Sequence, residues 1–197
     1  MTALRPAPLA RGFDWLLSAR GLAVGFVWGV LEGTFFFLVP DILITLVALF
    51  SIRQSWRQLL AVLAGSLLAG GGMFYFASVA PELARRMVLD VPFVSQAMFE
   101  TTRNAWEHFG VWALCQGPLS GIPYKVYAVQ APAHSGIVPF LLVSIPARLE
   151  RFLVIWALFA ALGLAVKRRI AANPGCAVAA HAVYWMSVYA VYWARLT

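Results

Sequence analysis

The stretch EGTFFFLVPD at residues 32–41 places two carboxylates and a proline inside an otherwise apolar run from Gly21 to Phe50. One straight helix over this run would be about 45 Å long, well over the ~30 Å hydrocarbon core of a bilayer. It would also bury Glu32 and Asp41 in hydrocarbon, each at a cost of about 2.5–3.5 kcal/mol. Two half-length helices that meet at Pro40 explain the length, the break and the charges together. We therefore predict a re-entrant hairpin whose tip is buried in protein or lines a wet cavity.

Composition indicates an integral membrane protein rather than a soluble enzyme. Hydrophobic residues make up 62% of the 197 residues, against about 45–50% in soluble domains, and the mean hydropathy is +0.80. A soluble fold of this length could not hide so much apolar surface, so the remainder is expected to face lipid. Charged residues are only 12%, and the eight Trp and six Tyr fit aromatic belts at the two bilayer interfaces.

A second break is predicted at residues 117–125, GPLSGIPYK. Two glycines, two prolines and a lysine cannot form a continuous lipid-facing helix. We expect a second re-entrant hairpin over about 108–145, followed by a helix that begins near Pro146 and ends at about Val166. The residues expected at the two hairpin tips are Pro40, Gly121, Pro123 and Tyr124.

The rest of the chain completes an all-α membrane fold. A basic loop (51–57) precedes a clear span at 59–80, and the polar stretch 81–107 reads as an amphipathic surface helix interrupted at Pro92. A last span covers about 176–193. Because the chain crosses the membrane once between the two hairpins, they are expected to have opposite orientations. The predicted fold is thus an inverted repeat of two hairpins packed with about three transmembrane helices.

The predicted organisation has three parts: a cytosolic N-terminal segment (1–20), a membrane domain (21–167), and a basic loop with a C-terminal transmembrane helix (168–197). The net charge is +7, and the basic residues lie at the ends of apolar runs. This placement fits topology signals and contacts with anionic lipid headgroups rather than a nucleic-acid interface. The bases assigned to the inner side are Arg5, Arg11, Arg20, Arg53, Arg57, Lys167, Arg168 and Arg169. Those assigned to the outer side are Arg85, Arg86, Arg103 and Arg195. This excess predicts a cytoplasmic N-terminus.

Five ionisable residues carry the functional hypothesis, because charged groups inside a membrane mark functional sites by default, and a sixth, Glu150, is expected to be a surface or pairing residue. If the hairpins face each other, their charges share one cavity. Lys125, Arg148 and Arg151 would bind a lipid phosphate there, and the two arginines share a helix face at i, i+3 spacing. Glu32 and Asp41 would take up and release protons.

Other interpretations remain open for the same residues. The acids and arginines could form purely structural ion pairs, or the arginines could extend to a headgroup layer without a transported ligand. The histidines His108, His134 and His181 are more typical of hydrogen-bonded packing than of a proton relay. Ser120 has no visible His or Asp partner, so we expect no catalytic residues. Cys115 and Cys176 form no spacing motif, so we expect no metal or cofactor.

Three segments resemble a known family. Residues 32–41 are similar to the first-hairpin motif of the DedA superfamily, also called VTT-domain or SNARE-associated proteins, and most of all to its YqaA-like branch. Residues 121–126, GIPYKV, resemble the second tip of that family. Residues 144–152, SIPARLERF, resemble the start of the helix that carries its two arginines. The three motifs occur in the family's order.

The resemblance implies two opposed re-entrant hairpins and a role in moving lipids across a bilayer. Bacterial relatives are linked to undecaprenyl phosphate recycling, envelope integrity and dependence on the proton-motive force, and eukaryotic relatives scramble phospholipids. By motif match, the functional residues would be Glu32, Asp41, Lys125, Arg148 and Arg151.

We therefore expect a transporter or flippase for an anionic, phosphate-bearing lipid, coupled to protons, in a bacterial inner membrane. Undecaprenyl phosphate is one candidate substrate. The alternatives are a non-transporting membrane scaffold or envelope-integrity factor and, third, a phospholipid scramblase or a membrane enzyme that acts on lipid phosphate. The expected partners are membrane lipids, an anionic headgroup and protons, with a homo-oligomer left open.

Overall fold

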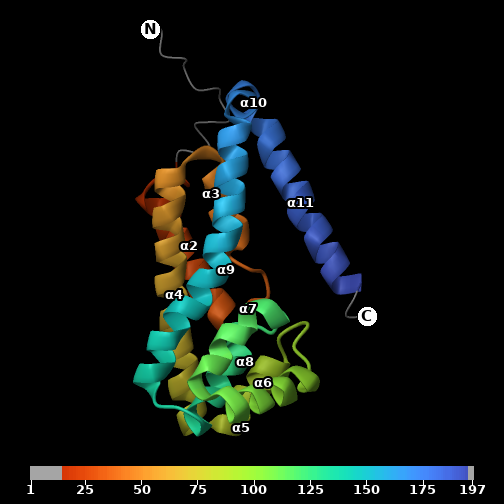
Figure 1. Ribbon diagram of the computed structural model, residues 1–197. Coiled ribbons are helices and arrows are strands. Elements are labelled where there is room, and N and C mark those ends of the chain that lie inside the picture. The colour runs from red at the N-terminus through yellow and green to blue at the C-terminus, as the bar shows by residue number, and fades with distance from the viewer. Residues whose placement is uncertain (1–14, 195–197) are drawn as a thin grey trace.

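The computed structural model describes residues 15–194, in which all regular secondary structure is helical and there is no strand. Two long helices and several shorter ones form an elongated bundle (Figure 1). In chain order the elements are α2 Ala19–Thr34, α3 Asp41–Phe50, α4 Ile52–Val79, α5 Pro81–Leu89, α6 Gln96–Phe109, the 3-10 helix η1 Gly110–Gln116, α7 Gly117–Ser120, α8 Tyr124–Gln130, the 3-10 helix η2 Ala131–Ala133, α9 Ile137–Ala165, α10 Lys167–Ala172 and α11 Pro174–Ala194.

The long helices α4 and α9 lie side by side and run in opposite directions (Figure 1). Aromatic pairs join them at both ends: the rings of Trp56 and Trp156 are 5.7 Å apart, and those of Phe74 and Phe140 are 5.4 Å apart. This pair of helices forms the frame against which both chain breaks pack.

Helix α2 packs along α4 through glycines. Gly21, Gly25, Gly29 and Gly33 recur at every fourth position of α2, and all four are buried. A Cβ added at Gly29 would meet the carbonyl oxygen of Val62 on α4. The two backbones are therefore in direct contact, as small residues permit between membrane helices. This spacing is visible in the sequence but was not part of our prediction.

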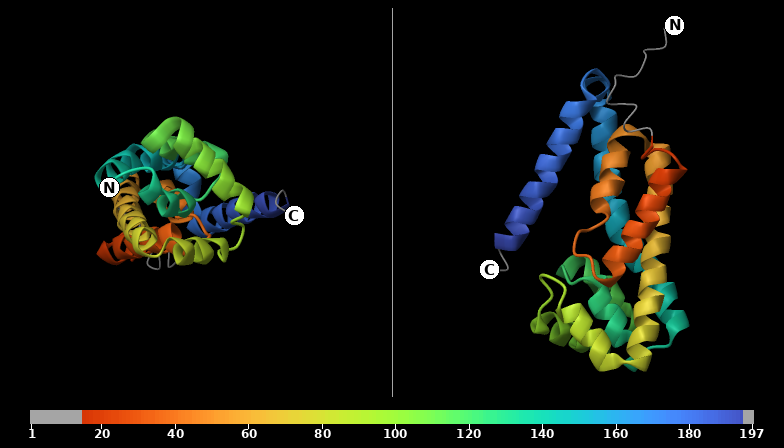
Figure 2. Two further views of the ribbon diagram at one scale, coloured as in Figure 1. Left: turned by 90° about the horizontal axis from the view of Figure 1, so that it is seen from below. Right: turned by 180° about the vertical axis from the view of Figure 1, so that it is seen from behind.

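The first predicted interruption is present and is wider than expected. Helix α2 ends at Thr34, and α3 begins at Asp41 with Pro40 as its N-cap, so that residues 35–40 are non-helical. The chain reverses direction there, and α3 returns toward the end of the molecule where α2 began (Figure 2). From this position α3 packs on α4 and α9.

The second interruption lies at residues 121–123, between α7 and α8. Gly121 has a φ of +72°, a left-handed conformation that glycine adopts without strain. Pro123 caps α8, and Tyr124 is its first residue. All four predicted tip residues thus lie at the ends of short helices beside a break.

The prediction that a helix begins near Pro146 is wrong. Helix α9 begins at Ile137, and Pro146 lies inside it. A proline removes only one hydrogen bond of the helix ladder, and the preceding turns are held by packing on α8. The rings of Phe140 and Tyr124 stack with centroids 5.9 Å apart, and the Tyr124 hydroxyl donates a hydrogen bond of 2.8 Å to Ser144 Oγ.

Two predicted loops are helical instead. Residues 52–57 form the first turns of α4, because the Ser51 side chain accepts the Gln54 backbone N–H as an N-cap. Residues 167–169 form the start of α10. The predicted surface helix at 81–107 is present as α5 and α6, separated at residues 90–95 around Pro92.

One helix within residues 15–194, Ile52–Val79, is long and apolar enough to cross a membrane by its length and composition. Apart from Lys125, Arg148 and Arg151, the lysines and arginines of the described part of the chain belong to helix segments at the two ends of the bundle (Figure 1). Arg20, Arg53, Arg57 and Lys167–Arg169 lie at one end, and Arg85, Arg86 and Arg103 lie at the other. Arg5, Arg11, Arg195 and most of the predicted segment 1–20 fall outside the described residues.

Replacement of Gly65 by alanine tests the close contact of α2 with α4. The new methyl group would meet the backbone carbonyl of Phe26, which cannot move aside, so the helices must separate. We expect Gly65→Ala to lower the free energy of unfolding by about 1–3 kcal/mol, measured by thermal unfolding in detergent micelles. Gly72 on the same helix has nothing nearby, so Gly72→Ala should be neutral or stabilise by up to about 1 kcal/mol. Equal melting temperatures for both variants would contradict the contact.

Candidate functional site

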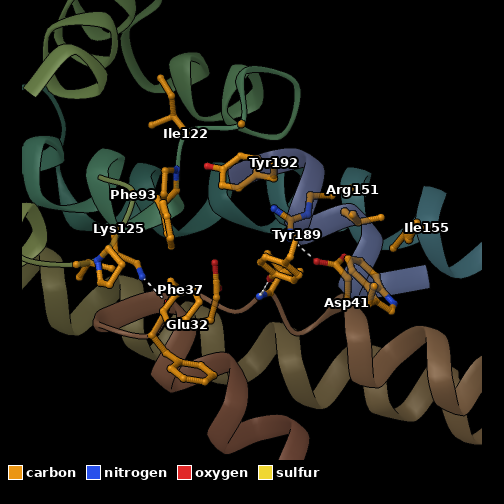
Figure 3. Close-up of a pocket in the computed structure, with 18 residues that line it drawn as sticks. Glu32, Phe37, Asp41, Phe93, Ile122, Lys125, Arg151, Ile155, Tyr189 and Tyr192 are labelled. Carbon is orange, nitrogen blue, oxygen red and sulfur yellow. Dashed lines mark hydrogen bonds and ion pairs between the residues drawn. The ribbon is translucent and has the colours of Figure 1, made fainter. Parts of the chain in front are cut away.

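A cavity of about 290 Å³ lies between the two chain breaks (Figure 3). Its walls come from α2, both breaks, the 90–95 connection, α9 and α11. Most lining side chains are apolar or aromatic. The ionisable and phenolic residues that line it are Glu32, Asp41, Lys125, Arg151, Tyr189 and Tyr192.

Glu32 lies in the last turn of α2 and pairs with Arg148 of α9. Arg148 Nη2 donates to Glu32 Oε2 at 2.5 Å, and both side chains are under a tenth exposed. The guanidinium also lies over the rings of Tyr124 and Phe152, at 4.9 and 5.0 Å from their centroids. Arg148 is thus held from three sides by one carboxylate and two aromatic faces. It borders a smaller space beside the second break rather than the large cavity.

Asp41 forms the second buried ion pair, with Arg151. Asp41 is the first residue of α3, where the helix dipole favours a negative charge. Its Oδ2 accepts a hydrogen bond from Arg151 Nη2, and its Oδ1 is buried without a hydrogen-bond partner among the described residues. The Asp41 side chain is 3% exposed, whereas the Arg151 side chain is 35% exposed. Arg151 therefore presents part of its guanidinium to the cavity.

Lys125 differs from the two arginines because it pairs with no carboxylate in the described part of the chain. It is 1% exposed, and its ammonium donates a hydrogen bond of 2.7 Å to the Phe36 carbonyl oxygen. In Figure 3 its side chain extends toward the first break beside Glu32. A buried ammonium that contacts a neutral carbonyl and lines a cavity is suited to receive an anion.

The non-helical backbone at residues 35–40 is stabilised by side chains from three different helices. Trp28 of α2 donates to the Leu38 carbonyl at 3.0 Å, and Lys125 of α8 donates to the Phe36 carbonyl. The Val39 backbone N–H donates to the Tyr189 hydroxyl of α11 at 2.8 Å. These bonds replace those of a helix ladder, whose loss in an apolar interior would cost several kcal/mol per group.

A stripe on α11 reaches the same region, which the sequence analysis did not anticipate. His181, Trp185 and Tyr189 recur at every fourth position. His181 Nε2 lies 2.9 Å from Thr45 Oγ1, and Trp185 Nε1 donates to the same hydroxyl at 3.1 Å. His181 is therefore a buried, hydrogen-bonded packing residue, as expected. The signal in the sequence is the i, i+4, i+8 spacing of polar-tipped rings in an apolar helix.

The other two histidines contact neighbouring groups away from the cavity. The His134 ring stacks on Trp106 at 5.7 Å, and His108 Nδ1 lies 2.7 Å from the Asn104 carbonyl oxygen.

The 90–95 connection holds a strained residue against the cavity. Phe93 has a φ of +70°, which costs a non-glycine residue on the order of 1–3 kcal/mol. Its ring contacts Phe37 of the first break and Tyr192 of α11, with centroids 5.8 and 6.4 Å away. Three segments far apart in the sequence thus meet at one aromatic cluster.

Two carboxylates and three bases meet at this site, which leaves one net positive charge at formal ionisation. The predicted residues are therefore close together, but with different surroundings. Lys125 and Arg151 face the large cavity with Glu32 and Asp41, whereas Arg148 lies behind Glu32. Glu150, which lies between the two arginines in the sequence, is exposed and lines neither space. The bases in this arrangement can hold an anion, and the anion can replace a carboxylate as the partner of one of them.

Comparisons of the chain with models of protein families, with curated proteins and with solved structures found no match.

Removal of Arg148 tests whether its pair with Glu32 is needed by the fold. Arg148→Met leaves a buried carboxylate without its base, so we expect a loss of about 3–5 kcal/mol in the free energy of unfolding. The double variant Glu32→Gln/Arg148→Met should recover most of that loss, because no charge is then left unpaired. Thermal unfolding in detergent measures both.

The exposed pair Arg103–Glu107 provides a matched control, with side chains 61% and 56% exposed. Arg103→Met should change the free energy of unfolding by less than about 1 kcal/mol. A double variant as unstable as Arg148→Met would contradict the predicted coupling.

Proposed function

We propose that this chain is an integral membrane protein that moves an anionic, phosphate-bearing lipid across a bilayer, coupled to protons. The observation that carries the proposal is the cavity between the two chain breaks, where buried acids and bases lie together. Charges of both signs in a small, mostly apolar cavity are typical of a site that binds an ion and exchanges protons.

Exposed apolar side chains support the membrane assignment. Large hydrophobic residues are exposed along four helices, in a pattern that would be costly in water. Basic residues lie at the two ends of the bundle, where headgroups would be. The exposed large residues include Val27 on α2, Leu60 and Leu68 on α4, Leu142, Val154 and Leu158 on α9, and Val183 and Met186 on α11.

The packing of the broken segments supports an inverted repeat of two re-entrant hairpins. The returning half of the first segment, α3, packs on α9, and the returning half of the second, α8, packs on α4. Each repeat unit consists of a broken segment and the long helix that follows it. The short returning helix of each unit therefore packs against the long helix of the other unit. An axis of twofold pseudosymmetry in the membrane plane would relate the two halves, as in other transporters built from inverted repeats.

The mechanism we propose is an exchange of partners. A lipid phosphate enters beside Lys125, which has no carboxylate partner to lose, and takes over the exposed part of Arg151. Asp41 is then left without its base, and protonation would relieve the cost of that buried charge. Departure of the lipid restores the ion pair and releases the proton.

We also propose membership of the DedA superfamily, since the residues that resemble its three motifs surround one cavity. On that basis the location would be a bacterial inner membrane with a cytoplasmic N-terminus, and undecaprenyl phosphate remains one candidate substrate.

The second candidate is a non-transporting membrane scaffold. It is favoured by one observation, that both acids already have a basic partner in this structure. A scaffold would use these pairs only for stability. Substitutions at the pairs would then lower the yield of folded protein and would leave no transport to measure.

Lys125→Met is the direct test of the anion site. Purified protein is reconstituted into vesicles that contain a fluorescent short-chain phosphatidic acid, and movement between leaflets is followed by reduction with dithionite. We expect Lys125→Met to slow movement about tenfold or more, because a charge-assisted contact is lost. Lys167→Met, at an exposed base on α10, should match the wild type. Equal rates for wild type and Lys125→Met would reject this anion site.

Proton coupling predicts a separate result. The wild-type rate should change when a pH gradient is imposed across the same vesicles, and Asp41→Asn, which cannot ionise, should weaken that response because Asp41 is the residue that takes up the proton in the proposed exchange. Glu100→Gln, at an exposed carboxylate on α6, serves as the control. An unchanged gradient response in Asp41→Asn would contradict the proposed protonation of Asp41.

A further inference from the structure

The cavity has a charged floor and an apolar rim. Three of its four charged residues are deep, with Glu32, Asp41 and Lys125 at 5% exposure or less, whereas the side chain of the fourth, Arg151, is 35% exposed. The lining residues that are exposed carry no charge: they are Pro92, Gly121 and Val188. A rim of this kind disfavours an opening to water and fits an opening to hydrocarbon.

Helix α11 forms one side of that rim. It leaves the end of the bundle at α10 and runs obliquely along the outside (Figure 1). Its C-terminal half contacts the segments around the cavity through the Tyr189 hydroxyl, which accepts the Val39 N–H, and through the Tyr192 ring, which packs against Phe93. The Phe93–Tyr192 ring contact lies in the seam between α11 and the 90–95 connection, and the Tyr189 hydrogen bond joins α11 to the first break beside that seam.

The volume of the cavity limits what it can enclose. At about 290 Å³ it lies just below the range of about 300–1,000 Å³ for pockets that enclose a small molecule. It can hold a headgroup and the start of a chain but not a whole lipid. The remainder of a bound lipid must leave the cavity, and the apolar rim is where hydrocarbon can do so.

We infer that the seam between α11 and the 90–95 connection is a lateral portal that holds the hydrocarbon chain of a bound lipid. Val188, Tyr192 and Phe93 contact the chain, while Lys125 and Arg151 hold the headgroup. Tyr189 positions α11 against the first break and so sets the width of the portal. The inference rests on the proposed function, which it extends with a route and a chain-binding site.

The test measures access to the cavity without any transport. Ile122 lines the cavity and is 8% exposed, so Ile122→Cys in a Cys115→Ala/Cys176→Ala background places one thiol inside. The protein in vesicles is labelled with either a dodecyl maleimide, which partitions into the bilayer, or a charged water-soluble maleimide. We expect the dodecyl reagent to label this thiol faster than the charged one does.

Val188→Trp should then narrow the portal and slow labelling by the dodecyl reagent about tenfold, as expected for bulk forced into a packed seam. Val191→Trp is the matched control, since Val191 is exposed on the same helix and does not line the cavity. Its labelling should equal that of the parent.

Tyr189→Phe, which removes the hydrogen bond to the Val39 N–H, should speed labelling about fivefold. Tyr184→Phe, at an exposed tyrosine on the same helix, should leave the labelling rate unchanged. Size-exclusion profiles verify that each variant is folded.

Three results would overturn the portal: faster labelling by the charged reagent, equal labelling of Val188→Trp and Val191→Trp, or no labelling by the dodecyl reagent. None of them depends on lipid movement. A protein that passes this test but fails to move phosphatidic acid would retain a chain-binding seam and lose the proposed transport activity. A protein that moves lipid with an unaffected Val188→Trp would keep the activity and lose the portal.

Discussion

The ion pair between Glu32 and Arg148 sets the constraint that the rest of the structure obeys. A carboxylate and a guanidinium are buried here as partners, because either one alone would be an uncompensated buried charge. Glu32 ends the helix before the first break, and Arg148 lies on the helix after the second. Neither segment can therefore be placed without the other. Asp41 and Arg151 repeat the arrangement on the next turn of α9.

The hydrogen bonds of the non-helical backbone also make the two breaks depend on each other. Residues 35–40 leave the helical ladder and take partners from Trp28, Lys125 and Tyr189. One partner comes from the preceding helix, one from the second break and one from α11. Lys125 thus has two roles, since it satisfies a carbonyl of one break and presents its charge to the cavity. A site held in this way is preorganised, and an anion would need only to compete for contacts that already exist.

The sequence predicted the breaks better than the elements around them. Pro40 and the segment 117–125 cannot continue a helix in lipid, so local chemistry alone locates both interruptions. The start of α9 could not be found in this way, because packing of Phe140 and Ser144 on α8 overrides Pro146. Likewise, the basic character of residues 52–57 masked a helix start that the Ser51 cap specifies.

The sequence predicted which residues form the candidate site but not how those residues are arranged. All five charged residues lie close together, but spacing could not tell that Arg148 is enclosed while Arg151 is partly open. That difference depends on which side chains cover each guanidinium, and Tyr124 and Phe152 lie far from each other in the sequence. The contribution of α11 also escaped, because its histidine, tryptophan and tyrosine read as ordinary packing until their partners were known.

The depth of the first break in a bilayer tests the account most directly. Phe35 is exposed, does not line the cavity, and lies at the break, while Leu68 is exposed on α4 and Arg57 lies near the end of the bundle. A spin label is attached to a cysteine at each position in turn, in a Cys115→Ala/Cys176→Ala background in vesicles, and collisions with oxygen and with a water-soluble nickel complex give its depth. We expect the label at Phe35 to be as deep as the label at Leu68 and much deeper than the label at Arg57, because the break lies inside the bilayer. A label at Phe35 as accessible to nickel as the label at Arg57 would place the break in water and contradict the account.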